Sequence, residues 1–117
     1  MDKVIRIDGR DVQFRATAAV PRLYRILFRR DILQDIAALQ KEIKKVKDEG
    51  GDLTSASLEI FENVAYVMAK HADPENVPDH VADWLDTFGT FSIYMVFPEM
   101  LELWDANMTT LNQSKKK

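Results

Sequence analysis

The sequence predicts a mainly helical domain that carries an N-terminal β-hairpin. An alternating segment opens the chain, and apolar residues then recur every three or four positions over long stretches. Glycine and proline separate these stretches into about four helices. The 117 residues, 46% of them hydrophobic and none of them cysteine, suit one domain without a disulfide framework. We expect this domain to span residues 1–111 and residues 112–117 to form a disordered, lysine-rich tail.

The hairpin is expected within residues 1–16. Polar and apolar residues alternate on both sides of Asp8-Gly9, a dipeptide that favours a tight turn between two strands. An isolated hairpin is only marginally stable in water. We therefore expect this one to pack against the helices that follow.

The first helical region begins near Pro21, since proline suits the first turn of a helix. Its apolar stripe has helical spacing and consists of Phe28, Ile32, Ile36, Leu39, Ile43 and Val46. The stripe predicts a helix to about Lys47, either continuous or divided at Arg29-Arg30-Asp31, because the apolar residues before that point face another side. Gly50-Gly51 marks the end of the region.

Three further helices are expected. The second begins with a cap at Thr54 or Ser55, runs to about Ala72, and is apolar on several sides, which is typical of a central, buried helix. A short third helix is predicted to begin at Pro78 and to end at Gly89. The fourth is predicted from about Phe91 to Met108, with Pro98 kinking or splitting it.

No pattern in the chain indicates an enzyme, a cofactor or a metal centre. His71 and His80 lie on either side of a proline-containing loop, with neighbouring aspartates that form no specific ligand pattern. The glycines occupy turn or cap positions, so no phosphate-binding loop is present. There is no secretory signal, and the apolar block 93–97 is too short to span a membrane. We expect a soluble, intracellular, non-enzymatic protein.

The charges are unevenly distributed, although the net charge is only −3. Residues 1–30 are rich in arginine and lysine, whereas residues 52–105 are strongly acidic and contain Lys70 as their only lysine or arginine. Such asymmetry suits either a partner of opposite charge or attraction between the two parts of the chain.

Four arginines and two tryptophans are the candidate partner-binding residues. Arg22, Arg25 and Arg29 share one helix face, and Arg15 is close to them in the sequence. This face suits an anionic partner, but the acidic remainder would repel nucleic acid, so a protein or an intramolecular acidic group is favoured. Trp84 and Trp104 lie on apolar helix faces and are expected in the core, with a role at the edge of a partner groove as the alternative.

Several segments, in order, resemble the small tail assembly chaperones of long-tailed bacteriophages and prophages of Gram-positive hosts. The resemblance runs through VIRIDGRDVQF, ATAAVPRLYRILFRRDIL, LEIFENVAYVMAKHADPENVP, WLDTF and IYMVFPEMLELWDAN, and so covers most of the chain. The chain departs from the family pattern at Arg29, where a small residue or glycine is expected before Arg30-Asp31.

The resemblance implies a non-enzymatic role in the host cytoplasm. Members of this family bind the long tape measure protein, keep it soluble while the tail tube polymerises around it, and are absent from the mature virion. The tape measure protein is thus the expected partner, with the major tail tube protein as a further candidate and self-association left open. Two other classes compete with this interpretation: a structural tail component, and a small nucleic-acid-binding or regulatory phage protein that uses the Arg22, Arg25 and Arg29 face.

Overall fold

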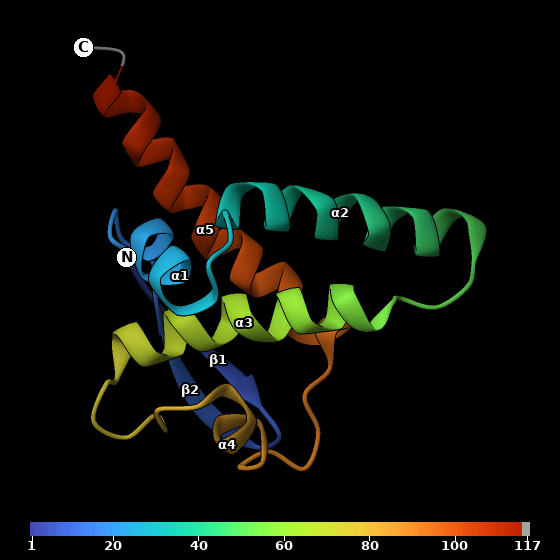
Figure 1. The fold of residues 1–117 in the computed structure, drawn as a ribbon, viewed down its shortest axis with the longest axis horizontal. Coiled ribbons are helices and arrows are strands. Elements are labelled where there is room, and N and C mark those ends of the chain that lie inside the picture. Colours follow the sequence, from blue (N-terminus) through green and yellow to red (C-terminus); the bar gives the residue numbers. More distant parts are fainter. Residues whose placement is uncertain (116–117) are drawn as a thin grey trace.

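The computed structural model confirms the mainly helical fold with an N-terminal antiparallel hairpin (Figure 1). It describes the backbone of residues 1–115 and the side chains of residues 1–109. The elements are β1 (Asp2–Ile7), β2 (Arg10–Arg15), α1 (Val20–Phe28), α2 (Ile32–Glu49), α3 (Ser55–Ala72), α4 (Val81–Leu85) and α5 (Ile93–Lys115).

The hairpin turns at Asp8-Gly9, as the sequence predicts. Both residues have positive φ, 52° and 75°, which is the backbone form that a two-residue turn between twisted strands requires. In the resulting register Ile5 lies opposite Val12, and both side chains are buried on the face that packs against the helices. The Asp8 carboxylate also accepts a hydrogen bond of 2.7 Å from the Gly89 N–H, which joins the turn to the loop after α4.

Helix α3 is the centre of the domain. It packs against β2, α1, α2, α4 and α5, and Figure 1 shows it crossing the middle of the molecule. Every residue from Asn63 to Ala69 is buried, which confirms the prediction of a central helix. The Thr54 hydroxyl caps its start by accepting from the Ser57 N–H. Glu42 of α2 accepts from the Thr54 N–H and the Ser57 hydroxyl, so the long α2 is tied to the first turn of α3.

The first helical region is divided into α1 and α2. Arg29 ends α1 in the left-handed conformation, with φ 59° and ψ 34°, and its N–H donates to the Arg25 carbonyl. The Asp31 carboxylate then caps α2 by accepting from the Leu33 N–H. Of the two alternatives left open by the sequence, the divided helix is therefore the one that forms, and the described chain has five helices instead of about four.

Helix α4 begins at Val81, later than the predicted start at Pro78. The Pro78 carbonyl accepts from the Tyr66 hydroxyl, and the Val77 carbonyl accepts from the Lys70 ammonium. These bonds to α3 direct the carbonyl groups away from a helical turn, and His80 becomes the N-terminal flanking residue.

Helix α5 is continuous where the sequence allowed a split. Pro98 lies near its start, where the missing N–H costs one hydrogen bond without interrupting the helix. The helix also continues past Leu111 to Lys115, through residues 112–115 of the predicted tail, because extending a formed helix requires little ordering per added hydrogen bond. Lys116 and Lys117 of that tail lie outside the described residues.

The two tryptophans test the core directly. Trp84 is 2% exposed and Trp104 is 4% exposed, and the Trp84 ring meets Tyr66, Phe88 and Phe91 edge-on. We predict that Trp84→Ala and Trp104→Ala each lower the free energy of unfolding by about 3–5 kcal/mol, because each leaves a large cavity. Chemical denaturation measures this, with Met95→Ala at a 75% exposed position as the control. Losses below about 1 kcal/mol for both tryptophans would place them outside the core.

Candidate partner-binding surfaces

The predicted arginine face is present on the outside of α1. Arg22, Arg25 and Arg29 are exposed, and Ile26 between them leaves 62% of its surface open to solvent. Within the described part of the chain, none of the three arginines forms an ion pair. We call Arg22, Arg25, Ile26 and Arg29 the α1 outer face. It combines free positive charge with an apolar side chain, a composition suited to contact with another protein.

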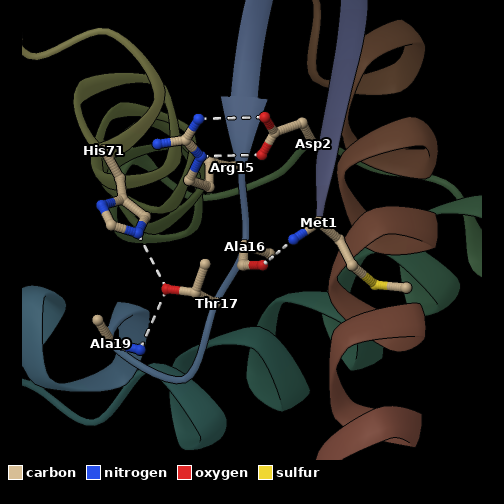
Figure 2. A network of polar contacts seen from close by, with 7 residues as sticks. All are labelled: Met1, Asp2, Arg15, Ala16, Thr17, Ala19 and His71. Carbon is tan, nitrogen blue, oxygen red and sulfur yellow. Dashed lines mark hydrogen bonds and ion pairs between the residues drawn. The ribbon is translucent and has the colours of Figure 1, made fainter.

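Arg15 does not belong to the α1 outer face, because it forms an ion pair within the hairpin. Its guanidinium lies over the hairpin and donates to both carboxylate oxygens of Asp2, at 2.9 and 3.2 Å (Figure 2). Hydrogen bonding to Arg15 lowers the pKa of Asp2. Arg15 is thus already paired within the hairpin, in contrast to the three arginines of the α1 outer face.

Trp84 and Trp104, the other two candidates, are core residues. Both side chains are almost fully buried, so they form no part of the surface that this structure presents. Trp84 instead belongs to a cluster of aromatic rings from α3, α4 and the segment before α5. The cluster packs α4 and the segment before α5 against α3, and it gives Trp84 a packing role.

A buried carboxylate fixes the joint between α1 and α2, and the sequence analysis missed it. Asp35, 5% exposed, accepts 2.8 Å hydrogen bonds from two nitrogens of Arg30 and a 2.7 Å bond from the fully buried Tyr24 hydroxyl. The Arg30 hydrogen bonds lower the pKa of Asp35, while burial, followed by Asp35 itself, raises the pKa of Tyr24. The signal in the sequence was an aspartate on the apolar stripe between Ile32 and Ile36.

A second polar junction positions the entry into α1. The Thr17 hydroxyl oxygen accepts from the Ala19 N–H at 3.2 Å and lies 2.9 Å from His71 Nε2 (Figure 2). The N-terminal ammonium donates to the Ala16 carbonyl, also at 2.9 Å, which closes the open end of the hairpin. Burial, followed by the positive charge of Arg15, lowers the pKa of His71. A neutral imidazole whose Nε2 accepts a hydrogen bond from the Thr17 hydroxyl satisfies this geometry.

Neither a cluster of metal-ligating side chains nor a membrane-spanning helix is found among the described residues. No three histidine, aspartate or glutamate side chains among them are grouped so that they could hold a metal ion. None of the described helices has the length and apolar content needed to cross a bilayer.

Comparisons with protein-family models, with curated proteins and with solved structures found no match to this chain.

Removal of the Tyr24 hydroxyl tests how much its hydrogen bond to Asp35 contributes to stability. We predict that Tyr24→Phe lowers the free energy of unfolding by about 1–3 kcal/mol, because it removes a hydrogen bond to a buried carboxylate. Tyr94→Phe is the matched control, since Tyr94 is 51% exposed and its hydroxyl has no partner among the described residues. Equal effects of the two substitutions, measured by urea denaturation, would contradict the proposed contribution of Asp35.

His71 should make stability depend on pH. Its pKa in the folded protein lies below the ordinary value of 6.5, so the unfolded chain binds the proton more readily. The stabilisation is therefore fully present above about pH 6.5 and is lost as the pH falls below that value. His71→Gln, which can still bond to Thr17, should flatten the pH dependence of the free energy of unfolding over this range. An unchanged slope in His71→Gln would refute the assignment.

Proposed function

We propose that this chain is a non-enzymatic phage tail assembly chaperone that binds and solubilises the tape measure protein in the host cytoplasm during tail tube assembly. The proposal rests on the ordered resemblance of its segments to that family. The structural observation that supports it is the α1 outer face, where three arginines that form no ion pair with any described residue surround the exposed Ile26.

The α1 outer face suits such a partner because its side chains are exposed and lie outside the core. The side chains that join α1 to the rest of the domain are the buried Val20 and Tyr24 and the partly buried Leu23 and Phe28. The outer face is therefore free to contact an apolar stripe on a long helical protein, with the arginines directed at flanking acidic groups. Arginine is one of the residue types most often found at the centres of protein interfaces.

Nucleic acid is the less favoured partner. The chain has a net charge of −3, and the acidic part between residues 52 and 105 would repel phosphates once they were close. A nucleic-acid-binding or regulatory role that uses the same arginines therefore stands as the second class, and a structural role in the finished tail as the third.

Co-expression provides the test of the chaperone proposal. We predict that expressing this chain together with the tape measure protein of the same phage or prophage raises the soluble yield of the tape measure protein, and that the two co-purify. Unchanged solubility without a complex would contradict the proposal. Finding the chain in purified virions would instead support the structural role.

The arginines can be examined in the same complex. Reversing Arg22, Arg25 and Arg29 together to glutamate should weaken the complex at least tenfold and reduce its dependence on salt, while the matched lysine variant retains most of the affinity. Circular dichroism should show both variants folded, because all three side chains are exposed. Tight, salt-sensitive binding to single- or double-stranded DNA or RNA that is lost on reversal would favour the nucleic-acid class.

A further inference from the structure

A second surface, separate from the α1 outer face, lies between α2 and α5. The two helices border a cleft of about 370 Å³. Figure 1 shows α2 running above α3, with the first turns of α5 behind α3. The main lining residues are Ile43, Lys44 and Lys47 from α2 and Tyr94, Phe97 and Leu101 from α5.

The cleft exists because the two helices that border it pack separately on α3. Helices α2 and α5 each pack on α3, which sets their separation without requiring their side chains to interlock. Ile43 and Leu101 are consequently only half-buried, and Tyr94 keeps 51% of its surface exposed. The apolar lining comes mainly from α5, while α2 contributes Ile43 and a polar edge. A trough with an apolar wall and a polar edge has the form that accepts an amphipathic helix.

The rim of the cleft is basic. Lys44 and Lys47 lie one turn apart on α2, and neither forms an ion pair with any residue that the structure describes. Asp48 is the one acidic side chain among the lining residues. A helix that enters the cleft would therefore gain most if acidic residues flanked its apolar stripe.

We propose that this cleft binds an amphipathic helix of the tape measure protein that carries acidic residues beside its apolar stripe. The assignment rests on the proposed function for the identity of the partner, and on the charge and shape of the cleft for its chemistry. The exposed apolar side chain of the α1 outer face lies among arginines, which Lys44 and Lys47 would repel, so that face of a second copy is a poor occupant.

Neighbouring residues supply matched controls on both walls. Lys45 is exposed beside Lys44, and Met95 is 75% exposed beside Tyr94, yet neither lines the cleft. The binding variants are therefore Lys44→Glu with Lys47→Glu, and separately Tyr94→Ser. Their controls are Lys45→Glu and Met95→Ser. All these positions are exposed, and thermal melts would establish that each variant is folded.

Two probes are used with the full-length chain. The first is the co-expressed tape measure protein, and the second is a synthetic helical peptide with a leucine stripe flanked by glutamates, compared with a twin flanked by lysines. We expect the paired lysine reversal to weaken both the complex and the binding of the acidic peptide about tenfold, and Tyr94→Ser to weaken them about fivefold. The controls should stay within twofold, and the lysine-flanked peptide should bind at least tenfold less tightly.

A photoreactive amino acid at position 94 provides an independent readout, because it should crosslink to the tape measure protein while the same group at position 82 on α4 should not. If the complex forms but tolerates the cleft variants and gives no crosslink from position 94, the cleft assignment is overturned and the chaperone function stands. If no complex forms but the acidic peptide binds with the expected sensitivity, the chaperone function fails and the cleft remains a site for an acid-flanked helix. Binding of neither probe, or a cleft occupied by a second copy of the chain, would overturn the assignment.

Discussion

The change of direction at Arg29 is the constraint on which the arrangement of the other helices depends. The apolar stripe could be followed by a single helix, yet the backbone enters the left-handed region at Arg29 and α2 starts afresh at Ile32. Asp35 then binds Tyr24 of α1 and Arg30 of the joint, so the two helices are held at a fixed relative position. A buried carboxylate that is fully hydrogen-bonded is costly to disturb, so these bonds fix the angle between α1 and α2.

This joint allows α1 and α2 to use different parts of α3. Each helix buries one side against α3, while the hairpin and α4 complete the core around the aromatic residues. The outward side of α1 and the edge of α2 that faces α5 are exposed, and both carry positive charges that form no ion pair within the described part of the chain. Two basic, partly apolar surfaces on one small domain would allow weak contacts to be repeated along an extended helical partner, and each could still be displaced.

Local sequence signals were sufficient for the hairpin and for the central helix. The dipeptide Asp8-Gly9 predicts the turn that forms there, and the apolar residues of α3 predict a helix that is buried on several sides. Contacts between distant residues were not accessible in this way. The hydrogen bond between Asp35 and Tyr24 joins α2 to α1, and no local pattern predicts it. The pairing of Arg15 with Asp2 likewise depends on the register of the two strands. The cleft between α2 and α5 could not be predicted either, since it arises from the separate packing of both helices on α3.

The most direct test of the joint is the free energy of unfolding of Arg29→Gly compared with Arg25→Gly. Glycine adopts the left-handed conformation without strain, so Arg29→Gly should stabilise the protein by about 0.5–1 kcal/mol despite its entropic cost. Arg25 lies within α1 and is also exposed, so Arg25→Gly should destabilise by about 1 kcal/mol. Opposite signs at these two positions are the predicted result. Equal destabilisation by both substitutions would mean that α1 and α2 form one continuous helix, and would contradict the account.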